Sequence, residues 1–152
     1  MSLSLWLLSL ATAALVAVLM EPWAAFLHGR IWHRSLWFLH RSHHRPSGPL
    51  EANDLFSLLH VPPSVALILW GTLVEPGVLP ALAFGTGLGM TAFGVGYFVV
   101  HDGLVHGRLP VGFLARIPWL ARVRDAHLEH HRIGGAPFGL FLGPRELARR
   151  RR

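Results

Sequence analysis

Three long stretches without a charged residue limit the possible folds of this chain more than any other feature. Residues 3–20 and 76–100 carry no charge, and residues 55–74 contain His60 as their only ionisable side chain. Each stretch approaches or exceeds the roughly 20 residues that a helix needs to cross the ~30 Å core of a bilayer. We therefore expect an all-α integral membrane protein with three to four transmembrane or re-entrant helices, formed by residues 1–152 as a single domain.

The first apolar stretch is interpreted as a retained anchor and not as a cleaved signal peptide. No positive charge precedes it, and Glu21-Pro22-Trp23 follow it in place of a small-residue cleavage site. Residues 111–120 and 136–142 are also apolar, but they are too short to cross a bilayer as simple helices. Whether these two segments span, re-enter or lie on the membrane is left open.

The arginines predict the orientation of the spans. All fourteen basic residues are arginine, and they lie within residues 28–54 and 101–152. Because cytoplasmic segments of membrane proteins are enriched in basic residues, both segments are expected in the cytoplasm of a multi-pass protein of the inner (plasma) membrane. The net charge of +6 suits an acidic partner, and anionic lipid headgroups explain it equally well. We expect contact with the lipid bilayer and none with nucleic acid.

Ten of the eleven histidines form one pattern that occurs twice, a pair five residues apart followed by a His-x2-His-His group. The first copy is His28, His33, His40, His43 and His44, and the second is His101, His106, His127, His130 and His131. Imidazole binds Fe, Cu, Zn and Ni, so two sets of five can hold two metal ions. The alternative is a set of surface histidines on polar loops, which the repetition of the pattern argues against.

The spacing predicts how the rings are presented. Residues at i, i+3 and i+4 share a helix face, so His40, His43 and His44 should point their rings to one place, and the second His-x2-His-His group should do the same. Residues five apart lie roughly 140° apart on an ideal helix. The two pairs of histidines five residues apart must therefore lie where a helix ends or bends, or their members bind different metals.

Short helices are expected to carry the two His-x2-His-His groups as a cytoplasmic, histidine-rich helical cap. The first is predicted at residues 36–44, ended by Pro46, Gly48 and Pro49, and the second at residues 120–132, ended by Gly134-Gly135.

Few residues besides the ten patterned histidines are candidates for a role in a metal or redox site. The polar side chains that could orient the second nitrogen of a ligating ring are Asp102, Asp125, Glu129 and Asn53. The chain has no cysteine and hence no cysteine-ligated iron–sulfur cluster, and it has no glycine fingerprint for a flavin or nicotinamide. We expect no catalytic residue beyond the metal centre and no organic cofactor site. Electrons for redox chemistry would have to come from another molecule.

Taken together, four motifs resemble the bacterial β-carotene hydroxylases of the membrane fatty acid hydroxylase superfamily. They are HGRIWHRSLWFLHRSHHRP (28–46), LEANDLF (50–56), YFVVHDGLVHGR (97–108) and AHLEHHRIGG (126–135), and the similarity covers about residues 20–142. The resemblance implies a non-haem di-iron monooxygenase that uses O₂ and an external donor such as ferredoxin. It would hydroxylate carbon 3 of the β-ionone rings of β-carotene, giving cryptoxanthin and zeaxanthin. The resemblance makes the ten clustered histidines the ligands of two iron ions, with zinc a possible substitute in purified protein.

Two kinds of alternative remain open from the sequence. A fatty acid or sterol hydroxylase, a desaturase or a carotenoid ketolase would use similar histidine clusters, and ligand spacing does not separate these activities. A metal transporter or storage protein is the non-enzymatic alternative. Transport favours polar groups near the middle of the spans, whereas here the clustered histidines gather at their predicted cytoplasmic ends.

Overall fold

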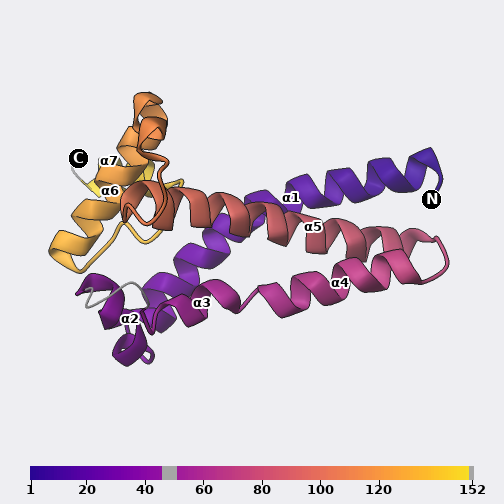
Figure 1. Ribbon diagram of the computed structural model, residues 1–152, viewed down its shortest axis with the longest axis horizontal. Helices are drawn as coiled ribbons and strands as arrows, with labels where there is room; N and C mark the ends of the chain where they lie inside the picture. The colour runs from indigo at the N-terminus through magenta and orange to yellow at the C-terminus, as the bar shows by residue number, and fades with distance from the viewer. Residues whose placement is uncertain (46–50, 151–152) are drawn as a thin grey trace. The chain divides into compact units, whose positions relative to one another are not determined.

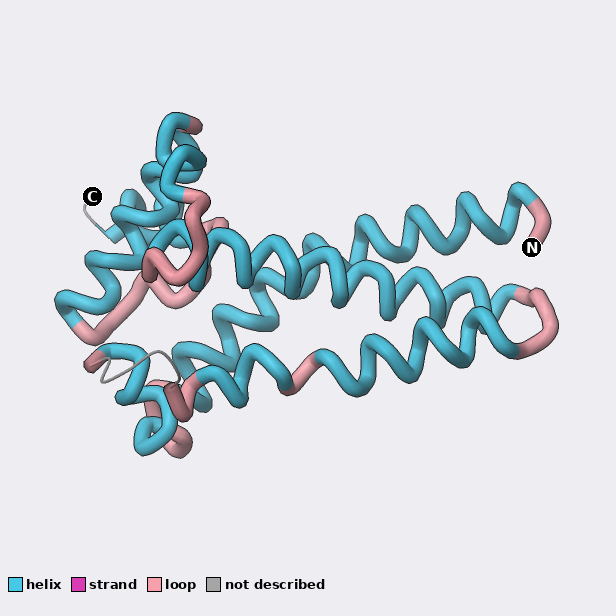
Figure 2. The backbone as a smooth tube through the Cα atoms, viewed as in Figure 1, coloured by secondary structure: helices cyan, strands magenta, loops and turns pink. Residues whose placement is uncertain are grey.

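The regular elements of this computed structural model, which describes residues 1–45 and 51–150, are all helical (Figure 2). The prediction of an all-α fold is therefore confirmed. Backbone contacts divide the chain into two compact units. The first unit consists of Met1–Met20 and Leu55–Val95, and the second unit of Glu21–Asp54 and Gly96–Arg152.

Three helical stretches are long and apolar enough to cross a membrane, as the sequence predicted. They are Leu3–Trp32, Asp54–Leu73 and Val78–Val105. The first is mainly helix α1 (Leu3–Leu27), the second is α3 (Asp54–Leu58) followed by α4 (Val61–Leu73), and the third is mainly α5 (Val78–Phe98).

Within the first unit, α4 and α5 run antiparallel and side by side, joined by a short loop at residues 74–77 (Figure 1). Glycines let the helices approach closely. A Cβ atom on Gly87 would lie 2.6 Å from the carbonyl oxygen of Ser64 in α4, and one on Gly89 would lie 2.5 Å from that of Ala13 in α1. Such contacts require small residues, as is common between membrane helices.

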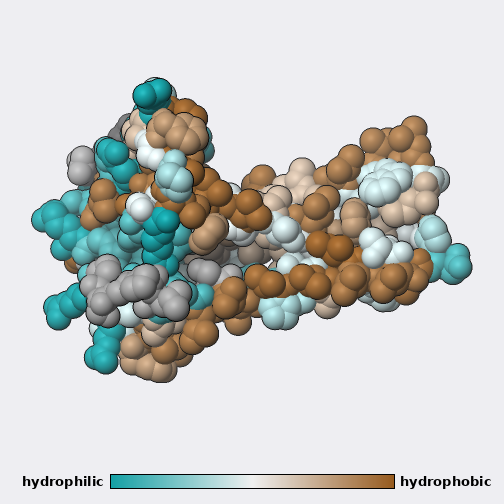
Figure 3. Space-filling view, in the orientation of Figure 1, coloured by the Kyte–Doolittle hydropathy of each residue, from teal (hydrophilic) through white to brown (hydrophobic). Residues whose placement is uncertain are grey.

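The outward faces of the first unit are apolar. Val18, Leu73 and Leu79 are 70%, 79% and 68% exposed. In the space-filling view, hydrophobic residues dominate the visible surface of α4 and α5 (Figure 3). Soluble monomers rarely expose such continuous apolar surface, whereas lipid chains cover it without cost.

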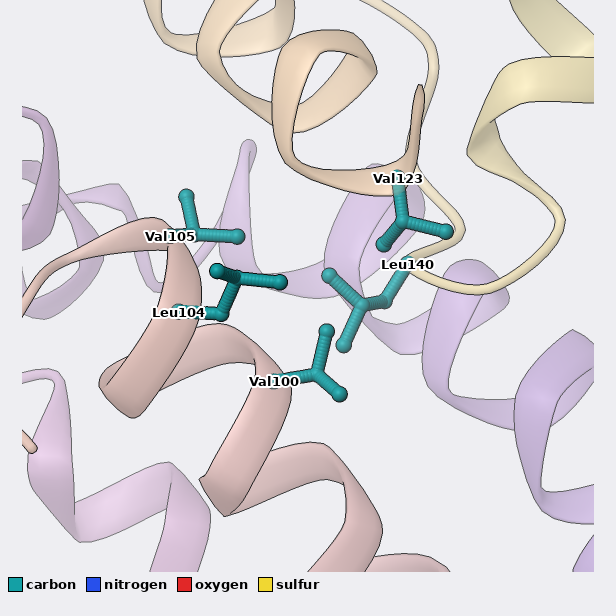
Figure 4. Close-up of a cluster of buried hydrophobic side chains, with 5 residues drawn as sticks. All are labelled: Val100, Leu104, Val105, Val123 and Leu140. Atoms are coloured by element: carbon teal, nitrogen blue, oxygen red, sulfur yellow. The ribbon is translucent and has the colours of Figure 1, made fainter. Parts of the chain in front are cut away.

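The second unit is built from shorter elements. They are the π-helical turn η1 (His28–Trp32), α2 (Trp37–His44), the π-helical turn η2 (Val99–Val105), the 3₁₀ turn η3 (Gly112–Arg116), α6 (Pro118–Ile133) and α7 (Gly143–Arg150). A small apolar core joins η2 to α6 and to the segment before α7. It consists of Val100, Leu104, Val105, Val123 and Leu140 (Figure 4).

Both predicted histidine-bearing helices are present, as α2 and α6. Helix α6 ends at Gly134, which has a φ of 67° and donates its N–H to the carbonyl oxygen of His130 at 2.8 Å. Glycine is favoured in this left-handed position, and the predicted end of the helix is confirmed. The predicted end of the first helix, at Pro46, Gly48 and Pro49, lies outside the described residues.

The two short apolar segments do not form spans of their own. Residues 112–116 form η3, and Phe113 within it is 61% exposed. Residues 137–142 run without a helix into α7, which the sequence did not predict. The Glu146 carboxylate of α7 accepts a hydrogen bond from the N–H of Phe138 at 2.9 Å and so holds this segment back against the helix.

Candidate metal centre

The ten patterned histidines all lie in the second unit, on or directly after four elements. The turn η1 and the residue after it carry His28 and His33, and η2 and the residue after it carry His101 and His106. Helix α2 carries three histidines, and α6 carries three. His60 stands apart from them, in the first unit.

The two π-helical turns explain the pairs five residues apart. The N–H of His33 bonds to the carbonyl oxygen of His28 at 3.0 Å, and the N–H of His106 bonds to that of His101 at 3.0 Å. This i to i+5 pattern widens the helical turn, so residues five apart share a face. The sequence predicted that the helix must end or bend at these pairs, and the structure shows the form that this takes. π-Turns occur often at functional sites.

The histidines gather into two groups. Within each group, one ligand nitrogen of every ring lies within 4.8 Å of the others. The first histidine group is His28, His33, His40, His44 and His130, and the second histidine group is His43, His101, His106 and His127. The tenth patterned histidine, His131, places its Nε2 atom 3.1 Å from that of His127, and its ring centroid lies 4.4 Å from that of His44.

This arrangement differs from the expected convergence of each His-x2-His-His group on one point. In α2, His40 and His44 join the first group while His43 joins the second. The reason is geometric. At about 100° per residue, positions i+3 and i+4 lie on opposite sides of position i and about 100° from each other. Two adjoining groups can therefore share one helix, and His130 of α6 likewise lies in the other group from His127.

Hydrogen bonds at Nδ1 fix three of the five rings of the first group. His28 Nδ1 donates to the carbonyl oxygen of Phe138 at 2.8 Å, and His130 Nδ1 donates to that of Gly135 at 2.6 Å. His40 Nδ1 lies 2.6 Å from Asn53 Oδ1. A carbonyl oxygen only accepts, so each of these neutral rings carries its proton on Nδ1 and leaves Nε2 unprotonated.

Carboxylates play the corresponding part at two of the four rings of the second group, whereas His127 Nδ1 is buried without a hydrogen-bond partner. His43 Nδ1 contacts Glu51 Oε2, and His101 Nδ1 contacts Asp102 Oδ2, each at 3.2 Å. A carboxylate or carbonyl at the second ring nitrogen is the usual partner of a metal-ligating histidine, because it sets the tautomer and the ring orientation.

The unprotonated Nε2 atoms suit a cation. His28 Nε2 and His40 Nε2 lie only 3.0 Å apart, although the Nδ1 contacts leave both atoms as acceptors. The Nε2 atoms of His43, His44 and His106 are buried and have no hydrogen-bond partner. Facing or orphaned lone pairs are costly in a protein interior. A metal ion within each group would remove that cost, so this donor set suits metal ions.

The surroundings keep these rings neutral. Burial, followed by repulsion from neighbouring histidines, lowers the pKa of His33 and the pKa of His40 to about 4. Burial likewise lowers the pKa of His106 and that of His130 to about 3. Since these pKa values lie well below 7, the rings do not have to lose a proton at neutral pH before they bind a metal.

The predicted orienting residues lie in two different settings. Asp102 and Asn53 contact ring nitrogens, as described above. Asp125 is paired with Arg124 at 2.9 Å and its side chain is 64% exposed, and Glu129 forms an ion pair with Arg132 at 2.7 Å.

Glu51 and Arg108 are site residues that the sequence did not predict. Glu51 lies eight residues after His43 in the LEANDLF motif, and Arg108 lies two residues after His106, so proximity to the histidines was the available signal. The carbonyl groups of Phe138 and Gly135 left no signal in the sequence, because every residue has one.

A cavity of about 660 Å³ lies beside the first histidine group. His33 is part of its wall, with Phe26 and Phe138 among the apolar lining residues and Arg30 and Arg34 among the charged ones. This size lies within the range of small-molecule sites in proteins.

The fold and the site define a helical membrane protein in which two adjoining histidine groups are suited to bind metal ions. This chain belongs to the fatty acid hydroxylase family, whose family model matches residues 13–144. No solved structure matches the chain.

Curated relatives carry specific names. "Beta-carotene hydroxylase 1, chloroplastic" of Capsicum annuum is 51% identical over 134 residues, which are 86% of this chain and 42% of the relative. "Beta-carotene 3-hydroxylase 1, chloroplastic" of Arabidopsis thaliana is 50% identical, with 86% and 43% covered. "Beta-carotene hydroxylase" of Pseudescherichia vulneris is 43% identical, with 80% and 66% covered. The chain thus spans about two fifths of the length of these plant relatives.

Proposed function

We propose that this chain forms a membrane non-haem di-iron monooxygenase that hydroxylates carbon 3 of the β-ionone rings of β-carotene, giving cryptoxanthin and zeaxanthin. The observation that carries the proposal is the pair of histidine groups, in which lone pairs from four segments converge. Three relatives that are 43–51% identical to this chain are named β-carotene hydroxylases, and these names support β-carotene as the substrate.

The ten patterned histidines are the proposed ligands, and two iron ions are the proposed cofactor. The residue types present fit iron because imidazole suits it, with zinc as a possible substitute in purified protein. Iron bound there would supply the redox chemistry that activates O₂. The chain's own contribution is to orient the rings through Nδ1, chiefly by Asn53, Glu51, Asp102 and two backbone carbonyls.

The cavity beside His33 is the proposed place for the substrate ring. β-Carotene is a hydrocarbon and stays in the bilayer, so its ring must approach a metal centre from an apolar environment. Phe26 and Phe138 form an apolar part of the cavity wall beside the charged Arg30 and Arg34, and its volume of about 660 Å³ leaves room for a cyclic end group.

The partner, the location and the domain organisation are also proposals. Electrons come from an external donor of the ferredoxin type, which agrees with a sequence that has no cysteine for an iron–sulfur cluster of its own. The arginine distribution supports an inner-membrane protein with the histidine groups facing the cytoplasm. We further propose that residues 1–152 act as a single domain.

Expression in β-carotene-producing cells tests the function. We expect new hydroxylated carotenoids in the pigment extract and about two iron ions per purified chain. His44→Ala should abolish the product while the protein still inserts, because a ring of the first group is lost. The matched control is His60→Ala, which removes a histidine of the first unit and should leave the product unchanged. A ketone as the new pigment, or unchanged pigment with altered lipids, would instead assign the chain to one of the alternative activities.

A further inference from the structure

Arg108 lies among three carboxylates that come from two separate segments of the second unit, Glu51 and Asp54 from one and Asp102 from the other. Its Nη1 atom donates to Asp54 Oδ1 at 2.8 Å and to Asp102 Oδ1 at 3.0 Å. Its Nη2 atom forms an ion pair with Glu51 Oε1 at 2.8 Å, a charge contact without the geometry of a hydrogen bond. The carboxylates of Glu51 and Asp102 are only 5% and 6% exposed. A guanidinium group is planar and presents several donors in a fixed geometry, so it can hold several carboxylates at once.

Two of these carboxylates are the ones that hold rings of the second histidine group. Glu51 binds Arg108 through one oxygen and His43 through the other, and Asp102 divides its oxygens in the same way between Arg108 and His101. The rings of His43 and His101 stack with their centroids 4.6 Å apart and their planes at 29°. The arginine is therefore the link between two carboxylate–histidine pairs that are far apart in sequence.

The backbone fixes Arg108 in this position. Gly107 has a φ of 68°, a left-handed conformation that favours glycine, and it reverses the chain directly after His106. After the reversal, the N–H of Arg108 donates to the carbonyl oxygen of Asp102 at 2.9 Å. Arg108 is thus anchored to the same residue by its main chain and by its side chain. On the other side, Asp54 Oδ2 accepts the N–H of Glu51 at 3.0 Å, which holds the facing segment.

We infer that Arg108 is a positioning residue for one metal ion of the pair, because it joins the His43–Glu51 and His101–Asp102 pairs into one rigid assembly. The inference rests on the metal binding in the proposed function. Without the guanidinium, three clustered carboxylates would repel one another, and two of them are buried. Loss of one partner of a buried ionic group leaves charge uncompensated, so the carboxylates should move apart and turn the two rings away from a common point.

The first histidine group offers an internal comparison. The described Nδ1 contacts there go to neutral acceptors, namely the Phe138 and Gly135 carbonyls and the Asn53 amide. None of these contacts involves Arg108. Loss of Arg108 should therefore weaken metal binding at the second group and leave the first group unchanged, whereas a general loss of structure would weaken both.

Titration of the purified full chain with Co²⁺ tests this selectivity, because the visible absorption of bound Co²⁺ reports its ligand geometry. In Arg108→Gln, we expect one Co²⁺ to bind as in the unaltered chain and the second to bind about 10- to 100-fold more weakly, the usual effect of losing an outer partner of a ligand. The spectrum with one Co²⁺ bound should match that of His101→Ala, which retains the first group. Arg108→Lys should stay weakened about 10-fold, since one ammonium cannot bridge these carboxylates.

The matched control is Arg124→Gln, which removes an arginine that pairs with Asp125 on the exposed side of α6. It should bind two Co²⁺ as the unaltered chain does. Asp54→Asn is the second variant. It removes the negative charge of one Arg108 partner, contacts no histidine, and keeps an amide oxygen that can still accept the N–H of Glu51. We expect it to weaken the second Co²⁺ selectively, by a few-fold. If Arg108→Gln does not fold, Asp54→Asn decides alone.

Three results would overturn the inference. The first is tight binding of both Co²⁺ ions by Arg108→Gln and Asp54→Asn, and the second is an affinity of Arg108→Lys for the second Co²⁺ equal to that of the unaltered chain. The third is equal weakening of both sites in a variant that keeps its helical content. The pigment assay separates this inference from the proposed function. If the variants lose the second Co²⁺ selectively but the unaltered chain makes no hydroxylated carotenoid, only the proposed activity is refuted. Hydroxylated product without selective Co²⁺ loss in the variants refutes only the role of Arg108.

Discussion

At the scale of single residues, the two histidine groups differ in what holds their rings. Neutral oxygens accept the Nδ1 protons of His28, His40 and His130, whereas carboxylates accept those of His43 and His101. A carboxylate partner raises the basicity of a ligating imidazole more than a neutral one does, because it stabilises the positive charge on the ring. Two metal ions bound here would therefore meet donors of unequal strength, the stronger in the second group.

Asn53 allows a test of the neutral anchors. Replacing it by alanine removes the Oδ1 acceptor that lies 2.6 Å from His40 Nδ1. The ring loses its fixed orientation, so we expect Asn53→Ala to weaken metal binding at the first histidine group by about 10- to 100-fold. Asp125→Asn is the control, since its side chain is 64% exposed and pairs with Arg124. Co²⁺ titration measures both, and unchanged affinity in Asn53→Ala would show that the anchor is dispensable.

At this scale, the sequence predicted which histidines belong to the site. Doubled spacing singled out ten histidines, and nine of them lie in two compact groups with the tenth in contact with both. The sequence did not predict how His43 and His130 are assigned, because that depends on how α2 and α6 face each other. Nor could it identify the Phe138 carbonyl as an anchor, since a backbone group carries no sequence signature.

At the scale of elements, α2 and α6 each serve both histidine groups. In α2 the i and i+4 histidines join the first group and the i+3 histidine joins the second, and in α6 His127 and His130 divide in the opposite sense. Each helix therefore contributes histidines to both groups. A rotation of either helix about its axis would disturb both groups together, which favours a rigid pair of helices around the site.

The glycines of α5 provide a test of helix packing. In Gly89→Ala, the added methyl group would lie 2.5 Å from the carbonyl oxygen of Ala13, so α1 and α5 must separate. We expect the free energy of unfolding to fall by about 1–3 kcal/mol. Gly94→Ala is the matched control on the same helix, because nothing lies within 4 Å of its added Cβ atom. It should leave that free energy unchanged or raise it by up to about 1 kcal/mol. Thermal unfolding of both variants in detergent measures the difference, and equal melting temperatures would contradict it.

The elements that the sequence predicted are those with strong local signals. Apolar length predicted the spans, and the Gly134-Gly135 stop predicted the end of α6. Helix α7 was missed because its arginines resemble a solvated tail, and its position depends on a contact between Glu146 and the N–H of Phe138 that no local pattern indicates. For the π-turns, the sequence predicted only that a regular helix ends or bends there, because several backbone distortions can bring His28 and His33 together.

At the scale of the whole molecule, chemistry and membrane anchoring are divided between the two units. The ten patterned histidines, Arg108 and the three carboxylates that it contacts belong to the second unit, whereas the first unit exposes long apolar helices. All fourteen arginines also lie within the limits of the second unit. If the arginines fix which segments stay in the cytoplasm, they fix the location of the histidine groups as well.

The absence of cysteine makes this orientation directly measurable. Glu75→Cys places a thiol in the exposed loop between α4 and α5, and Ala148→Cys places one on an exposed position of α7. Because the basic residues favour the cytoplasmic side, a membrane-impermeant thiol reagent applied to intact spheroplasts should label Glu75→Cys alone. Both should react after the membrane is made permeable, and the cysteine-free chain, the control, should never react. Labelling of Ala148→Cys in intact spheroplasts would place α7 outside. It would also remove cytoplasmic electron donors from the candidates, since the histidine groups share a compact unit with that helix.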